Sequence, residues 1–122
     1  MLPASRRFSR ALDLGCGDGW FAERVAGSGA ARYVVPVEVR ARRRSRVRPV
    51  LYDGRRLPFA DRTFDLVYAI DVLHHSPRPV ECLEELLRCA GDTVILKDHT
   101  AASGWQRALL AVLDEIGNRR FG

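Results

Sequence analysis

Apolar residues recur along the chain in two alternating patterns, short strand-like runs and longer runs with helical spacing. The strand-like runs predict β-strands at residues 10–14, 33–39, 49–52, 64–70 and 93–97. Apolar residues three or four positions apart predict helices over residues 20–26, 79–90 and 105–116. Strands that alternate with helices in this way are typical of an α/β fold with a parallel sheet.

The second predicted helix has the clearest boundaries. Pro79 stands at its first position, acidic residues follow in its opening turns, and Gly91 comes just past its end. The buried stripe expected for this helix is Val80, Leu83, Leu87 and Ala90. The stripe expected for the last helix is Trp105, Leu109, Leu113 and Ile116.

Five strands with intervening helices predict a Rossmann-like, three-layer α/β/α sandwich around a mostly parallel five-stranded sheet. Neither a repeat nor a Pro/Gly/Ser linker divides the sequence, so residues 1–122 are expected to form a single domain. Pro36 lacks the N–H of a ladder hydrogen bond, which argues against a well-paired central strand over residues 33–39.

The composition excludes several classes of protein. Hydrophobic residues make up 47% of the 122 residues and charged residues 29%, which is the balance of a globular protein rather than of a disordered or collagen-like chain. No apolar run approaches the roughly 20 residues of a membrane span. Residues 1–10 lack the apolar stretch of a secretory signal, so we expect a cytoplasmic protein.

The net charge is +5, and six of the nine residues from Arg40 to Arg48 are arginine. Such a block could contact phosphate groups, or it could be a solvated loop or short helix. The three cysteines form an odd set without a CxxC pair, which argues against a disulfide framework and against a zinc site. Cys82 and Cys89 would share one helix face as small buried thiols.

The segment from Leu12 to Trp20 carries the strongest chemical signal. A predicted strand runs directly into glycines at positions 15, 17 and 19, and a helix begins just after them. Glycine permits the positive φ of a tight turn and lets a ligand approach the backbone closely. The start of the helix offers free N–H groups and a positive dipole end to an anion.

Acidic residues stand at the ends of the first three predicted strands. Asp13 precedes the glycine turn and would suit a cationic group such as an amine or a sulfonium. Glu38 is placed like the acid that accepts ribose hydroxyls in dinucleotide folds. Asp53 could accept a hydrogen bond from an exocyclic amine such as adenine N6. These positions describe a ligand with an amino acid end, a ribose and a base, and S-adenosylmethionine fits that description.

On these residues the chain resembles the class I S-adenosylmethionine-dependent methyltransferases, in the branch similar to the ubiquinone/menaquinone-biosynthesis-type enzymes. The stretch from Leu12 to Gly19 matches the first motif of the family residue by residue. Residues 53–67 match the stretch from the adenine-binding acid through the fourth strand, and residues 71–75 match the segment that follows. The resemblance covers nearly the whole chain from Arg10 onward.

The resemblance implies S-adenosylmethionine as methyl donor, no metal, and a small-molecule acceptor. The residues that it implies for the cofactor are Asp13, Gly15, Gly17 and Gly19 around the methionine moiety, Glu38 at the ribose, Asp53 at the adenine, and Ile70 and Asp71 at the methyl end, with Cys16 and Gly54 completing the set. We do not expect nucleic acid or a membrane as a partner.

Methyl transfer from a sulfonium is an in-line displacement in which alignment of the reacting atoms supplies much of the acceleration. A base is needed only if the acceptor must lose a proton. Asp71, His74, His75 and His99 follow strand ends, where ligands bind in such sheets, and the three histidines are the candidate catalytic residues. In family members the histidine pair often packs the pocket wall or caps the next helix, so that role stays open.

Two features depart from the family pattern. The segment 40–48 is shorter than the dozen or so residues of a usual parallel connection, so we expect a vestigial helix and a weak third strand. The family sheet has seven strands, whereas this sequence ends after the helix that follows the fifth. We therefore expect a truncated fold whose fifth strand is an open edge available for self-association.

These departures leave alternatives to an active enzyme. The chain could be a non-catalytic S-adenosylmethionine-binding module, or a fragment that needs a partner to complete its sheet. Nucleic-acid methylation is less supported, because residues 71–74 lack the Asn/Asp-Pro-Pro-Tyr signature. The GxGxG spacing and Asp13 argue against a NAD-dependent oxidoreductase.

Overall fold

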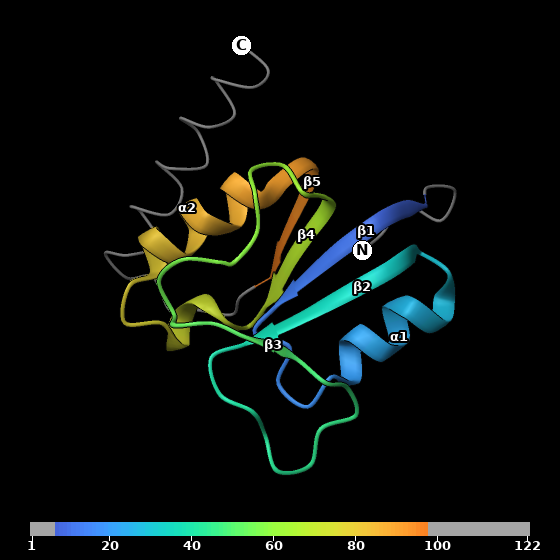
Figure 1. The fold of residues 1–122 in the computed structure, drawn as a ribbon, viewed down its shortest axis with the longest axis horizontal. Helices are drawn as coiled ribbons and strands as arrows, with labels where there is room; N and C mark the ends of the chain where they lie inside the picture. The colour runs from blue at the N-terminus through green and yellow to red at the C-terminus, as the bar shows by residue number, and fades with distance from the viewer. Residues whose placement is uncertain (1–6, 98–122) are drawn as a thin grey trace.

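The computed structural model describes residues 7–97 (Figure 1). Its elements are β1 (Phe8–Leu14), α1 (Trp20–Ser28), β2 (Ala31–Glu38), β3 (Val50–Leu51), β4 (Phe64–Ile70), the 3₁₀ turn η1 (Leu73–His75), α2 (Pro79–Cys89) and β5 (Ala90–Lys97). The five strands form one sheet in the order β3-β2-β1-β4-β5, and all neighbouring pairs are parallel. The predicted α/β class and parallel sheet are confirmed. The helix expected over residues 105–116 and His99 lie outside the described residues.

The two helices lie on opposite faces of the sheet (Figure 1). Successive side chains of a strand point to opposite faces, so β1 contributes residues to the hydrophobic core on each face of the sheet. Ala11 packs in one cluster with Val25 of α1, whereas Leu12 packs in the other with Leu86 of α2. The central strands are buried on both faces, which explains their nearly continuous apolar sequences. No helix among residues 7–97 is both long enough and apolar enough to cross a membrane.

The buried face of α2 differs from the expected stripe. Pro79 begins the helix as predicted, but Val80 is only half-buried. The buried residues are Cys82, Leu83, Leu86, Leu87 and Cys89. This wider arc includes both thiols, and the prediction that Cys82 and Cys89 are small buried thiols is confirmed.

The end of α2 also differs from the prediction. The helix passes into β5 with no loop between them, because Ala90 is already extended at φ −87° and ψ 127°. Gly91 is therefore a strand residue, where we had predicted the stop of the helix. A side chain at this position would lie 3.3 Å from the carbonyl oxygen of Arg62, so the glycine allows a close approach of backbone to backbone.

Pro36 lies inside β2, a strand that is well paired with β1 and has β3 on its other side. The carbonyl oxygen of Val37 accepts the Gly15 N–H at 2.8 Å, so the backbone polar groups of Val37 point toward β1. The backbone of Pro36, the preceding residue, therefore points toward β3. On that side β3 pairs only with Val37 and Glu38, so no ladder hydrogen bond needs the N–H that Pro36 lacks. The expected conflict is thus resolved by the shortness of β3.

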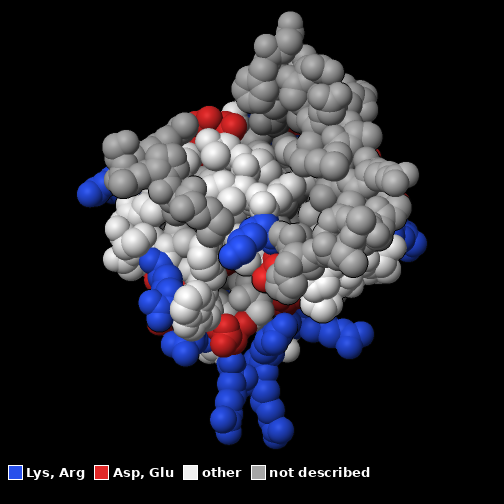
Figure 2. Space-filling view, turned by 180° about the vertical axis from the view of Figure 1, so that it is seen from behind, with Lys and Arg blue, Asp and Glu red and all other residues white. Residues whose placement is uncertain are grey.

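The connection between β2 and β3 contains no helix, where a vestigial one was expected, and β3 has only two residues, both exposed, as the short segment predicted. All six arginines between Arg40 and Arg48 are exposed. Figure 2 shows basic side chains projecting at the end of the molecule where this loop lies. The loop is nevertheless anchored, because the Arg46 N–H donates to the carbonyl oxygen of Asp18 at 2.7 Å. The arginine-rich loop thus packs beside the glycine turn.

Candidate functional site

The glycine turn between β1 and α1 uses its three glycines for different reasons. Gly15, Gly17 and Gly19 all have positive φ, at 71°, 59° and 87°. A side chain on Gly15 would lie 2.5 Å from Val72, and one on Gly19 would lie 2.5 Å from Val47, so the protein itself fills both positions. A side chain on Gly17 would meet only the Arg42 guanidinium, at 3.8 Å. The protein thus fills the side-chain direction at Gly15 and Gly19, whereas at Gly17 only Arg42 lies in that direction.

Glu38, at the end of β2, is bound to the glycine turn. Its Oε2 accepts the N–H of Gly17 at 2.9 Å, and its Oε1 accepts the N–H of Val39 at 3.0 Å. Each carboxylate oxygen has two acceptor positions, so each keeps one for a ligand. The side chain is thereby held in place before any ligand binds.

The turn does not leave all of its N–H groups free, which corrects the expectation of an open anion site. The Gly17 N–H donates to Glu38, and the Trp20 N–H at the start of α1 donates to Asp18 Oδ1 at 3.0 Å. Two carboxylates of the chain itself thus take part of the positive field that a helix start would offer to an external anion. This arrangement suits a neutral or cationic ligand group better than a phosphate.

Asp13 is buried at the end of β1, with 3% of its surface exposed. It is in register with Tyr68 of β4, whose hydroxyl donates to Asp13 Oδ2 at 3.0 Å. Phe21 of α1 packs edge-on against Tyr68 at 5.3 Å and helps to close the site from water. Burial raises the pKa of Asp13 to about 7, the Tyr68 hydrogen bond opposes this rise, and the charge of Glu38 adds to it.

Asp13 is expected to make the stability of the chain depend on pH. Its pKa of about 7 in the folded chain lies above the ordinary value of 3.8, so the folded state holds a proton that the unfolded state releases in this window. The free energy of unfolding should therefore fall as pH rises, by up to about 1.4 kcal/mol per unit between these two values. Asp13→Asn should lack this fall. By about pH 8 its free energy of unfolding should therefore have risen by on the order of 4 kcal/mol relative to that of the parent chain.

Urea denaturation across this pH range measures the effect. Glu84→Gln, which removes an exposed carboxylate of α2, is the matched control and should track the parent chain at every pH. A constant difference between Asp13→Asn and the parent chain across the range would contradict the assignment.

A cavity of about 670 Å³ opens beside Glu38, at the carboxyl ends of β2 and β3. Its lining includes Glu38, Asp53, Gly54 and His75 from the predicted site residues. The other predicted residues within the described chain do not line it, but the turn borders it through the hydrogen bond from Gly17 to Glu38. Its volume lies within the range of about 300–1,000 Å³ that is usual for small-molecule sites.

Asp53 stands at the start of the loop that follows β3. Its Oδ1 accepts the N–H groups of Arg55 and Arg56 at 2.8 and 3.0 Å, and these bonds hold the pKa of Asp53 below its usual value. Oδ1 is thus partly used by the loop itself. A side chain on Gly54 would meet only Val39, at 3.8 Å, so the backbone beside Asp53 is accessible.

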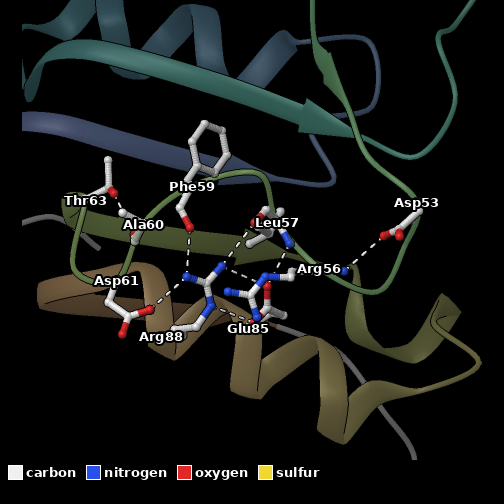
Figure 3. A network of polar contacts seen from close by, with 9 residues as sticks. All are labelled: Asp53, Arg56, Leu57, Phe59, Ala60, Asp61, Thr63, Glu85 and Arg88. Atoms are coloured by element: carbon white, nitrogen blue, oxygen red, sulfur yellow. Dashed lines mark hydrogen bonds and ion pairs between the residues drawn. The ribbon is translucent and has the colours of Figure 1, made fainter.

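Arg88 of α2 holds this loop in place, as Figure 3 shows. Its guanidinium donates to the carbonyl oxygens of Phe59 and Leu57 at 2.7 and 3.1 Å. It also donates to Glu85 Oε2 at 2.7 Å, while Glu85 Oε1 accepts the Leu57 N–H at 2.7 Å. The hydrogen bond from Arg88 lowers the pKa of Glu85. One half-buried ion pair thus fixes the loop that carries Asp53.

The segment after β4 brings only some of the predicted residues to the cavity. Ile70 ends β4 and packs with the α1-side cluster. Asp71 has φ 55°, a left-handed conformation that is strained for a residue with a side chain. The ring centroids of His74 and His75 lie 3.8 Å apart within η1 with the rings tilted by 43°, and of the two only His75 lines the cavity.

Sequence reasoning missed several residues of this site. Tyr68 lies opposite Asp13 only because of the register between β1 and β4, and neither sequence segment encodes that register by itself. Val47 and Val72 cover two glycines of the turn from loops distant in sequence. Cys16 was expected beside the cofactor, and it lies buried in the turn with a pKa raised by burial to about 11.

The comparison with protein families decides the identity of the domain. A family described as methyltransferase domain matches residues 12–93, which include the glycine turn, Glu38, Asp53 and the segment after β4. The chain belongs to this methyltransferase family. The suspected relationship to class I S-adenosylmethionine-dependent methyltransferases is thereby confirmed, and the solved structures agree with it.

A curated relative and two solved structures place the methyltransferase domain among known proteins. Cycloartenol-C-24-methyltransferase 1 of Oryza sativa subsp. japonica is 50% identical over 36 residues, which are 30% of this chain and 10% of that protein. An S-adenosylmethionine-dependent methyltransferase from Aquifex aeolicus is 18% identical with a TM-score of 0.68, over 92% of this chain and 73% of its own. The cyclase SpnF is 21% identical with a TM-score of 0.70, over 93% of this chain and 53% of its own.

These similarities differ in how much of each protein they cover. At such identities the two solved structures show a shared fold. The chain spans a tenth of the length of the curated relative and about half of SpnF. Among residues 7–97, no group of three or more His, Cys, Asp or Glu side chains is arranged to hold a metal ion.

Proposed function

We propose that this methyltransferase domain binds S-adenosylmethionine at the carboxyl end of its sheet and transfers the methyl group to a small-molecule acceptor. The observation that carries the proposal is the Glu38 carboxylate, which is fixed by the Gly17 and Val39 N–H groups and lines the cavity. It keeps one acceptor position on each oxygen, as two ribose hydroxyls would require.

Other residues are also consistent with S-adenosylmethionine as the ligand. Asp13 is a buried carboxyl group with no cationic partner in the described chain, and an ammonium or sulfonium nearby would favour its charged form. Asp53 and Gly54 line the cavity beyond Glu38, where the adenine would follow the ribose. Gly15, Cys16, Gly17 and Gly19 would surround the methionine moiety, with Ile70 and Asp71 toward the methyl end.

In this proposal the protein acts chiefly by holding the reacting groups in line. When bound, S-adenosylmethionine supplies a methyl group already activated on a sulfonium, so in-line attack by an aligned acceptor suffices. The packing of Val47 and Val72 against the glycine turn helps to hold the turn in one conformation. Preorganisation of this kind avoids rearrangement during the reaction.

His75 is the candidate general base that the cavity favours. It lies in η1 after β4 and lines the cavity with Glu38 and Asp53, so it could accept a proton from a bound acceptor. The His74 ring contacts it at a tilt of 43° and is a candidate to orient it. His99 remains a sequence-based candidate.

A second candidate is a domain that binds S-adenosylmethionine without transferring the methyl group. The chain is similar in fold to a cyclase, at a TM-score of 0.70. This similarity supports the second candidate, because the fold also occurs in a protein named for a reaction other than methyl transfer. Transfer of radiolabelled methyl from S-adenosylmethionine to a metabolite extract separates the two candidates. A labelled product that is lost in His75→Ala supports the enzyme, whereas binding without product supports the second candidate.

Glu38→Gln is expected to weaken binding of S-adenosylhomocysteine about ten- to hundredfold, because the amide NH2 group that replaces one carboxylate oxygen cannot accept a hydrogen bond and the remaining oxygen is uncharged. Isothermal titration calorimetry measures the affinity. Glu84→Gln, on the exposed face of α2, removes the same charge and should leave the affinity within about twofold. Equal affinities for the two variants would remove the ribose assignment.

A further inference from the structure

The cavity beside Glu38 has a basic rim that the cofactor does not explain. Four arginines line it, Arg40, Arg42, Arg55 and Arg78, against two carboxylates. All four arginines are exposed, whereas Cys82 is buried and Tyr52 and Val72 are half-buried. The cavity thus has an apolar interior and a positively charged mouth.

The positive charge of the rim is not neutralised by the described part of the chain. Among residues 7–97 the guanidinium groups of Arg40, Arg42 and Arg55 form no hydrogen bond or ion pair, and Arg78 has only a loose contact of 3.7 Å with Glu81. The carboxylates of Glu38 and Asp53 are bound by backbone N–H groups instead. A ligand at the mouth would therefore meet unpaired guanidinium groups.

S-adenosylmethionine accounts for at most one of these arginines. It carries one carboxylate against an ammonium and a sulfonium, so its net charge is positive and a positive rim disfavours it. Arg42 lies at the point where a Gly17 side chain would project, next to the turn predicted for the methionine moiety, and it can pair with that carboxylate. Arg40 and Arg55 remain without a role in cofactor binding.

We infer that the mouth of the cavity binds a small anionic molecule, whose phosphate or carboxylate group is held by Arg40 and Arg55. The planar guanidinium fork matches both anions and forms two parallel hydrogen bonds with either. This anion site goes beyond the proposed function, and its test is independent of methyl transfer. A cavity of about 670 Å³ has room for a small anion beside the cofactor.

Binding of two anionic probes to the full chain tests the inference separately from cofactor binding. Inorganic pyrophosphate and the tricarboxylate tricarballylate are titrated with and without S-adenosylhomocysteine, and the Gly54 amide signal reports binding by NMR. The test variant is Arg40→Gln with Arg55→Gln. The matched control is Arg24→Gln with Arg32→Gln, which removes two charges where the guanidinium groups lie over Trp20 and Tyr33, outside the cavity lining.

Saturable binding of at least one probe is expected, and it should weaken about tenfold or more in the test variant but less than about threefold in the control. Preference for pyrophosphate assigns a phosphate, and preference for tricarballylate assigns a carboxylate. The affinity for S-adenosylhomocysteine should stay within about twofold in both variants. The absence of probe binding, or an equal loss in both variants, would overturn the inference while leaving the cofactor proposal intact.

Two further outcomes would also overturn it. A loss of S-adenosylhomocysteine affinity in the test variant, with probe binding unchanged, would assign Arg40 and Arg55 to the cofactor. Tight, salt-dependent binding of a short RNA or DNA that survives in the test variant, without probe binding, would show that the arginine-rich loop serves nucleic acid instead.

Discussion

Gly15→Ala is expected to reduce the affinity for S-adenosylhomocysteine by about a hundredfold and to destabilise the fold by roughly 2–4 kcal/mol. The new methyl group would lie 2.5 Å from Val72, in a residue whose φ of 71° already disfavours a side chain. The turn must therefore shift, and it carries Gly17, whose N–H holds the Glu38 carboxylate. Urea denaturation and calorimetry measure the two effects.

Two further variants separate strain in the turn from a general effect of alanine. Gly27→Ala, in α1, places its methyl group in open space at an ordinary helical position and should stabilise the chain by about 0.5–1 kcal/mol. Adding Val72→Ala to Gly15→Ala removes the clash but not the backbone strain, so it should restore part of the affinity. Unchanged affinity in Gly15→Ala would show that the turn can relax without disturbing the site.

Arg88→Ala is expected to lower the free energy of unfolding by about 3 kcal/mol or more, because it leaves a largely buried carboxylate and two carbonyl groups without their donor. The side chains of Arg88 and Glu85 are only 17% and 16% exposed. The loop that carries Asp53 should loosen at the same time. Hydrogen exchange of the Leu57 amide, which donates to Glu85, reports that loosening directly.

Arg78→Ala is the matched control for Arg88→Ala. Arg78 is 44% exposed and only 3.7 Å from Glu81, a surface pair whose loss should cost less than about 0.5 kcal/mol. If both variants lose the same small amount of stability, the ion pair between Arg88 and Glu85 does not hold the loop.

Much of this fold could be predicted from local sequence, because its strands and helices are short and strongly patterned. The Pro79 start of α2 and the glycine turn after β1 each depend on neighbouring residues, and both were predicted correctly. The end of α2 could not be predicted in this way. Gly91 looks like a helix stop, but it serves a close backbone contact with Arg62 that only the folded sheet creates.

The candidate site was predictable in its residue types and much less in its contacts. Asp13, Glu38 and Asp53 stand at strand ends, so the sequence alone brings them to one edge of a parallel sheet. What each one touches depends on strand register and on loops distant in sequence. Tyr68 beside Asp13, and the backbone N–H groups around Glu38, are contacts of that kind.

The direct passage from α2 into β5 has a consequence for how this domain can vary among relatives. Adding or removing one residue at the junction of Cys89 and Ala90 would turn every following side chain of β5 to the opposite face of the sheet. Length changes are therefore barred here, whereas the exposed Arg43 and Arg44, between the cavity lining and the residues that pack on the glycine turn, could accept them. Inserted tags or reporter peptides belong between these two residues, away from the residues that pack on the glycine turn.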